Sequence, residues 1–181
     1  MIVADPAGWG EAIEVIQPDA MICALGTTWK QAGKDEAKFR AVDQDLVLST
    51  ARAALAQGVA NFAAISSAGA SPTSKNLYLR VKGEVERDLR ALKFKRLDIL
   101  RPGLLKGARQ GELRFAETLG KIASPLTDML LQGNMRRYRS IQARMVAEAA
   151  LELVSRKAAG RFTHDNDAIR RAARDWNKRH A

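Results

Sequence analysis

The 181-residue sequence has one cysteine and only two histidines. A single cysteine excludes a disulfide scaffold, and this set is too small for the usual zinc or iron–sulfur modules, so we predict no metal site. No apolar run has the length needed to cross a bilayer. The first residues also lack the basic segment and apolar core of a secretory signal. We therefore expect a cytoplasmic protein that has no membrane partner.

The composition that remains is that of an ordinary globular protein, and the length suits a single domain over residues 1–181. The charge is uneven: residues 101–181 hold 17 basic and 8 acidic side chains, whereas residues 1–100 hold 13 and 12. The densest basic cluster, Arg136-Arg137-Tyr138-Arg139, is typical of either a phosphate contact or a solvated loop. We expect a small-molecule substrate and no specific nucleic-acid partner, because net charge alone is a weak guide to partners.

Apolar runs alternate with helical patterns in the first half. Four runs predict strands, at residues 2–4, 20–25, 61–65 and 97–100. Helical spacing lies between them at residues 8–16, 35–57 and 75–93. The run 20–25 is continuously apolar, which is typical of a strand that is buried on both faces. The alternation predicts a parallel sheet flanked by helices over residues 1–104.

The second half, residues 105–181, reads as a mainly helical part on the substrate side of the sheet. Helices are predicted over residues 112–131 and 140–156, and Asp167 is a candidate cap for a last helix. His164 falls in a predicted loop. Ligands of parallel α/β sheets bind at the carboxyl ends of the strands. Small or polar residues follow the predicted strands there, namely Asp5, Gly26-Thr27, Ser66-Ser67 and Pro102-Gly103.

Tyr78 and Lys82 are four residues apart, so a helix places both side chains on one face. A neighbouring ammonium group favours phenolate, and we expect Lys82 to lower the pKa of the Tyr78 phenol toward working pH. Tyr78 could then exchange a proton with a substrate oxygen that a nearby serine holds. The spacing alone is weak evidence, because such a pair is more often a contact on a helix surface.

The order of these features makes the sequence resemble the short-chain dehydrogenase/reductase superfamily. The resemblance is closest to an atypical, NAD(P)-binding branch that includes the Tat-interacting-protein oxidoreductases and bacterial epimerase-like proteins. It covers roughly residues 1–160. The segments that carry it are 23–28, 42–43, 65–70, 76–84 and 100–105.

The resemblance implies roles for individual residues. Tyr78 would be the catalytic acid/base, Lys82 its partner and a contact of the nicotinamide ribose, and Ser67, in preference to Ser66, the residue that orients the carbonyl. Asp43 lies near the position of an asparagine that many members use. The remaining cofactor-binding residues that the resemblance implies are Asp5 at the adenine, Pro102 near the nicotinamide, and Ala24, Leu25, Gly26 and Thr27 along the cofactor.

One departure from the superfamily is large: neither G-x-G-x-x-G nor G-x-x-G-x-x-G occurs in the sequence. That turn binds the cofactor pyrophosphate at a helix N-terminus. We therefore expect an N-terminally incomplete Rossmann-like sheet that binds NAD or NADP poorly by itself and is either unstable or self-associates through an exposed sheet edge. We also expect an upstream segment of roughly 40–60 residues that carries the missing β-α-β part.

The expected function is NAD(P)-dependent oxidoreduction of a carbonyl or hydroxyl substrate, by hydride transfer with Tyr/Lys acid–base chemistry. Three alternatives stay open: a non-catalytic nucleotide-sensing or interaction protein on the same fold, a nucleotide-sugar epimerase-like protein, and a nucleic-acid-binding protein that uses the basic half.

Overall fold

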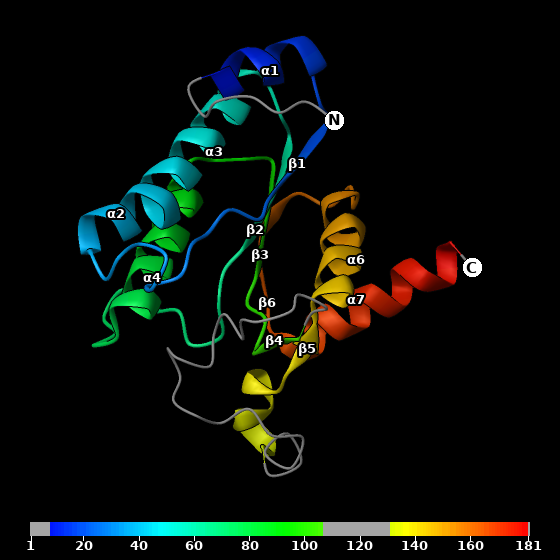
Figure 1. Ribbon diagram of the computed structural model, residues 1–181. Coiled ribbons are helices and arrows are strands. Elements are labelled where there is room, and N and C mark those ends of the chain that lie inside the picture. Colours follow the sequence, from blue (N-terminus) through cyan, green and yellow to red (C-terminus); the bar gives the residue numbers. More distant parts are fainter. Residues whose placement is uncertain (1–7, 107–130, 181) are drawn as a thin grey trace.

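The computed structural model describes residues 8–106 and 131–180. Its central feature is a parallel four-stranded sheet (Figure 1). The strands lie in the order β1-β2-β3-β6. Their bounds are Ala20–Cys23, Asn61–Ile65, Arg96–Leu100 and Gly160–His164. The predicted α/β class with a parallel, Rossmann-like sheet is confirmed. Asp5 and the segments 2–4 and 112–130 lie outside the described residues.

Helices cover both faces of the sheet (Figure 1). On one face α1, α3 and α4 pack against Phe62 and Leu97, and on the other α6 and α7 pack against Ala63 and Leu100. The helix bounds are α1 Trp9–Ile16, α2 Glu36–Arg40, α3 Val47–Ala56, α4 Leu77–Ala91, α6 Ala143–Val154 and α7 Asn166–Arg179. Apolar side chains of β1, β2 and β3 that point to opposite faces of the sheet thus fill two separate cores.

Short elements connect the main ones. The π-helical segment η2 (Ala41–Leu46) joins α2 to α3, and the 3-10 helix η3 (Gly133–Tyr138) precedes α6. The strands β4 (Leu105–Lys106) and β5 (Ile141–Gln142) form a separate parallel pair. The helix predicted over residues 35–57 is confirmed, because α2, η2 and α3 follow one another without a break from Glu36 to Ala56, and the middle stretch is π-helical.

Other local predictions need correction. The run 20–25 is a strand only over Ala20–Cys23, and three of its four residues are half-buried rather than buried, because β1 is an edge of the described sheet. His164 ends strand β6 instead of lying in a loop, so the part after residue 104 adds a strand to the sheet. Asp165, not Asp167, caps α7, since its carboxylate accepts the Ala168 N–H at 2.8 Å. Self-association through the β1 edge stays a prediction.

Two glycines allow close packing at the carboxyl ends of the strands. A Cβ on Gly83 of α4 would lie 2.2 Å from the carbonyl carbon of Ser71, in the loop after β2. A Cβ on Gly103, after β3, would lie 2.1 Å from the Arg139 carbonyl oxygen. The two glycines thus allow α4 and the segment after η3 to pack against the ends of the sheet, where the candidate sites lie.

No helix within the described ranges is long and apolar enough to span a membrane.

Candidate functional site

Tyr78 and Lys82 occupy the first turns of α4, which begins where the Asn76 side chain accepts the Leu79 N–H at 3.2 Å. Lys82 is buried, and its Nζ lies 2.8 Å from Oδ1 of the buried Asp43. Asp43 comes from η2, and its Oδ2 accepts the Thr27 N–H at 2.7 Å. One carboxylate therefore links the segment after β1, the π-helix and α4.

The predicted catalytic residues lie together. The Lys82 ammonium is 5.9 Å from the centre of the Tyr78 ring, and the phenol shares a hydrogen bond with the buried Ser67 hydroxyl. A cavity of about 110 Å³ opens beside them. Its lining comprises Ala24, Leu25, Gly26, Thr27, Thr28, Trp29, Asp43, Ile65, Ser66, Tyr78, Lys82 and Leu105. The strand-end segment singled out in the sequence thus borders the Tyr/Lys pair.

The electrostatics of Tyr78 differ from the expectation. Burial raises the pKa of the Tyr78 phenol above its ordinary value, the Ser67 hydrogen bond lowers it, and the charge of Asp43 raises it. The expected decrease was wrong for a physical reason. Burial of the phenol is the largest cause, and the Lys82 ammonium is paired with the Asp43 carboxylate at 2.8 Å, whose charge opposes the phenolate. Near neutral pH the phenol therefore keeps its proton, as a proton donor must.

Asp43→Asn should lower the pKa of Tyr78, because the substitution removes a negative charge that opposes phenolate and leaves the Lys82 ammonium unpaired. The measurement is tyrosinate absorbance against pH. A Tyr138→Phe background leaves Tyr78 as the sole tyrosine. Asp45→Asn, two residues away on the same segment, is the matched control and should leave the curve in place. An unchanged or higher pKa in the Asp43→Asn protein would contradict this electrostatic picture.

The remaining predicted residues are placed as follows. A Cβ on Gly26 would lie 3.3 Å from the Asp43 Oδ1 and 3.6 Å from the Lys82 Nζ, so the backbone passes close to the ion pair. Pro102 follows β3, its carbonyl accepts the Ala68 N–H at 2.9 Å, and it does not line the cavity. Ser66 does line the cavity, whereas Ser67 contacts the phenol.

Sequence reasoning missed Glu86. This buried carboxylate accepts the Ser66 hydroxyl at 2.5 Å and is held by Arg101 through Nε at 2.8 Å and Nη2 at 2.5 Å. A signal was present, because Glu86 follows Lys82 by four residues and so shares its helix face. Glu86 engages Ser66 and leaves Ser67 as the serine that contacts Tyr78.

The parallel sheet with helices on both faces is a Rossmann-like α/β fold, and it brings the serines after β2 beside the tyrosine and the lysine of α4. Comparison with family models is more specific, since residues 12–134 match the model described as HIM1. The chain belongs to the HIM1 family.

Curated relatives agree with this assignment. The chain is 39% identical over 138 residues to "Protein fmp52, mitochondrial" of Emericella nidulans, covering 71% of this chain and 58% of that protein. It is 48% identical over 103 residues to "Protein HTATIP2" of Rattus norvegicus, covering 57% and 41%. The chain spans about half the length of these relatives. The prediction of a cytoplasmic location is contradicted, because FMP52 relatives from Emericella nidulans, Meyerozyma guilliermondii and Saccharomyces cerevisiae are named mitochondrial.

Solved structures show the same fold at low identity. UDP-N-acetylglucosamine 4-epimerase from Bacillus cereus superposes with a TM-score of 0.62 at 14% identity, over 94% of this chain and 68% of that one. UDP-glucose 4-epimerase of Thermus thermophilus in complex with NAD superposes with a TM-score of 0.59 at 18% identity, over 94% and 66%. These likenesses establish the architecture of the sheet and its helices.

Proposed function

We propose that this chain is part of an NAD(P)-dependent oxidoreductase that reduces a carbonyl or oxidises a hydroxyl group. The observation that carries the proposal is the contact of Ser67 with Tyr78, and of Tyr78 with Lys82, beside a cavity at the carboxyl ends of β1 and β2. Membership of the HIM1 family and the shared fold of NAD-binding epimerases support it.

The residues present fit the nicotinamide-ribose end of such a cofactor. Lys82 is a buried cation at the cavity wall, and the backbone of Gly26 passes it without a side chain. The segment Ala24 to Thr27 and Lys82 would hold the ribose. A bound nicotinamide supplies or accepts a hydride. The glycine-rich turn for the pyrophosphate has no counterpart in these 181 residues.

The chain's own residues would handle the proton. In the reducing direction the Tyr78 hydroxyl donates its proton to the oxygen of the substrate carbonyl, and because its pKa is raised the phenol still carries that proton near neutral pH. The Ser67 hydroxyl, which contacts the phenol, would orient the same oxygen. Lys82 and Asp43 hold this corner of the cavity in place through their buried ion pair.

Quenching or enhancement of NADH and NADPH fluorescence tests the proposed binding. Lys82→Met should weaken cofactor binding about tenfold or more, because it removes a charge-assisted hydrogen bond to the ribose. Lys95→Met, at an exposed lysine beyond α4, is the control and should bind like the unaltered chain. Thermal unfolding of both variants separates lost binding from lost folding. Equal binding by a folded Lys82→Met protein would remove Lys82 from the cofactor site.

A second candidate is a non-catalytic nucleotide-sensing protein on the same fold. One observation favours it: Asp43 neutralises Lys82, and the Tyr78 pKa is raised rather than lowered, so the pair lacks the activation that oxidation of a hydroxyl requires. Cofactor binding without turnover on a panel of aldehydes, ketones and nucleotide sugars would favour this candidate. Turnover on any of them would exclude it.

A further inference from the structure

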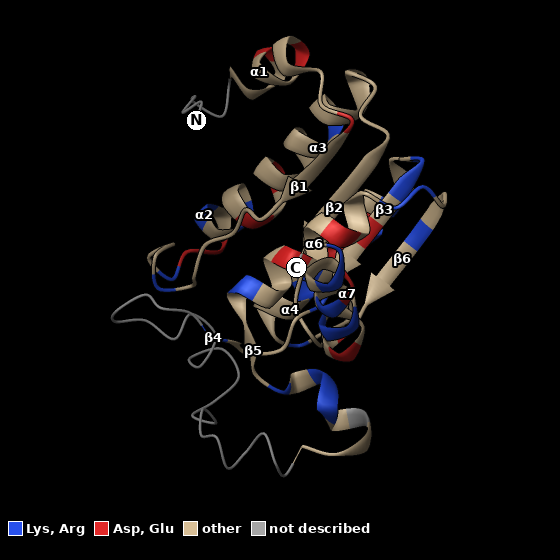
Figure 2. Ribbon diagram, turned by 90° about the vertical axis from the view of Figure 1, so that its right-hand side faces the viewer, with Lys and Arg blue, Asp and Glu red and all other residues tan. Residues whose placement is uncertain are grey.

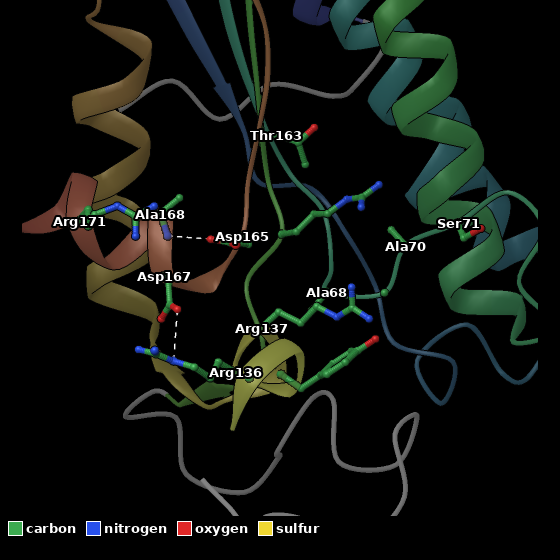
Figure 3. A pocket seen from close by; sticks show the side chains of 14 residues that line it. Ala68, Ala70, Ser71, Arg136, Arg137, Thr163, Asp165, Asp167, Ala168 and Arg171 are labelled. Atoms are coloured by element: carbon green, nitrogen blue, oxygen red, sulfur yellow. Dashed lines mark hydrogen bonds and ion pairs between the residues drawn. The ribbon is translucent and has the colours of Figure 1, made fainter. Parts of the chain in front are cut away.

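A second and larger pocket lies at the carboxyl ends of β2, β3 and β6, where η3 forms its floor (Figure 3). Its volume is about 650 Å³, which is enough for a metabolite-sized molecule. Four arginines line it, namely Arg101, Arg136, Arg137 and Arg171, with Asp165 and Asp167 as the acidic members. Figure 2 colours several Lys and Arg positions along the ribbon of α7, so part of the charge excess of the second half lies on a helix that borders this pocket.

The acidic groups at this pocket are already engaged. Asp165 caps α7 through the Ala168 N–H at 2.8 Å, and Asp167 pairs with Arg136 at 3.4 Å. Arg101 is held by the buried Glu86. Arg137 and Arg171, by contrast, pair with no carboxylate among residues 8–106 and 131–180. Two guanidinium groups at the pocket are thus left for an anionic ligand.

Arg137 is presented in a defined orientation. Its guanidinium carbon lies 5.0 Å from the centre of the Tyr138 ring, and the side chain extends toward Ala68 across the pocket (Figure 3). Tyr138 in turn packs against Gly69, where a Cβ would lie 3.2 Å from the phenol oxygen. Stacking on a ring leaves the N–H groups at the edge of the guanidinium available, and their planar fork matches phosphate oxygens.

The residues that follow η3 are anchored. The side chain of Asn166, which is fully buried, donates to the Arg139 carbonyl at 2.7 Å, and Arg170 donates to the Ser140 carbonyl at 2.5 Å. The Arg139 carbonyl also packs against Gly103, which has no room for a side chain. A segment that is held in this way loses little conformational freedom when a ligand binds, so its contacts with the ligand contribute more fully to affinity.

We propose that this pocket binds the phosphate or diphosphate group of a small organic molecule, with Arg137 and Arg171 as the donors. A phosphate or diphosphate group offers more charge and more free oxygens to the two arginines than a carboxylate, which satisfies a single guanidinium fork. The volume beyond those two side chains would take the organic part. A nucleic acid fits less well, because its affinity comes from many phosphate contacts along an extended surface rather than from one concave pocket.

The pocket adjoins the candidate catalytic cavity. Ser66 lines the cavity and Ala68 to Ser71 line the pocket, so one loop after β2 borders both. If the proposed oxidoreductase function holds, the substrate is a phosphorylated carbonyl or alcohol whose anionic group lies in this pocket. This identification of the substrate class rests on the proposed function, while the anion site itself does not.

Calorimetric titration of the full chain with inorganic phosphate and pyrophosphate, without any nicotinamide, tests the anion site. Both should bind, and acetate at the same ionic strength should not. Arg137→Gln and Arg171→Gln should each weaken pyrophosphate binding about tenfold or more, since each removes a charge-assisted contact. Arg174→Gln is the matched control: it lies on α7, is exposed and does not line the pocket, but changes the net charge equally.

Three results would overturn the proposal. The first is the absence of pyrophosphate binding. The second is an equal loss of pyrophosphate affinity in Arg137→Gln, Arg171→Gln and Arg174→Gln, which would indicate that net charge rather than a defined site attracts the anion. The third is a single-stranded oligonucleotide that displaces pyrophosphate at lower concentration and loses affinity equally in all three variants. Failure of the proposed function appears differently: pyrophosphate binding would still depend on Arg137 while NADH and NADPH fail to bind.

Discussion

Tyr78→Phe should lower kcat for reduction of a carbonyl substrate by about 10²–10⁴-fold, the usual contribution of a positioned general acid. The phenol has a hydrogen bond with Ser67 and its ring centre lies 5.9 Å from the Lys82 ammonium, and burial raises its pKa, so it carries its proton near neutral pH. Phenylalanine keeps the ring, including its packing against Phe39 at 6.0 Å between centroids. The fold should therefore persist. The measurement is steady-state turnover with NADH or NADPH, once a substrate has been found in the carbonyl panel.

Arg87→Gln, on the exposed side of the same helix, is the control and should leave kcat unchanged. Thermal unfolding of both variants shows whether the helix is intact. Water can replace a lost acid inefficiently, so a small residual rate is expected. A Tyr78→Phe protein that turns over as fast as the unaltered chain would show that Tyr78 is not the acid and would leave the Ser67 contact as a structural one.

Asp98→Ala should lower the free energy of unfolding by about 3–5 kcal/mol, the effect of leaving a buried charge without its partner. Arg96 and Asp98 are neighbours on one face of β3, and both are buried. The guanidinium lies 2.6 and 2.8 Å from the two carboxylate oxygens, and it also donates to the Leu153 and Ala158 carbonyls. His164 at the end of β6 completes the cluster, with its Nε2 2.8 Å from Asp98.

Denaturant unfolding of the purified variants measures this loss. Asp175→Ala, at an exposed carboxylate that pairs with Arg156, should change stability by less than about 0.5 kcal/mol. An Arg96→Met, Asp98→Leu double variant should recover part of the loss, because no charge is then left buried. If Asp98→Ala unfolds like the control, the cluster does not hold β3, β6 and the end of α6 together as its contacts indicate.

The alternation of strands and helices could be predicted because it is written in local periodicity. An apolar run identifies β2, the apolar residues Leu97, Ile99 and Leu100 identify β3, and apolar residues at intervals of three or four identify α4. Strand β6 was not predicted, because the exposure of its side chains alternates and Arg161 and Thr163 make it polar. Its strand structure comes from pairing with β3. The edge position of β1 likewise depends on which strands pair with it, which its apolar composition does not reveal.

The candidate site likewise combines features that the sequence predicts with features that only the tertiary structure shows. The sequence alone places Tyr78 and Lys82 on one helix face and Ser67 at a strand end, because i,i+4 spacing and the carboxyl ends of parallel strands are local or topological features. Tertiary structure alone decides that Asp43 pairs with Lys82 and that burial, together with the Asp43 charge, raises the pKa of Tyr78. It also decides that Arg137 and Arg171, 34 positions apart in the sequence, line one pocket. Charge pairing and burial depend on distances in space between segments remote in sequence, and no local pattern in this chain specifies those distances.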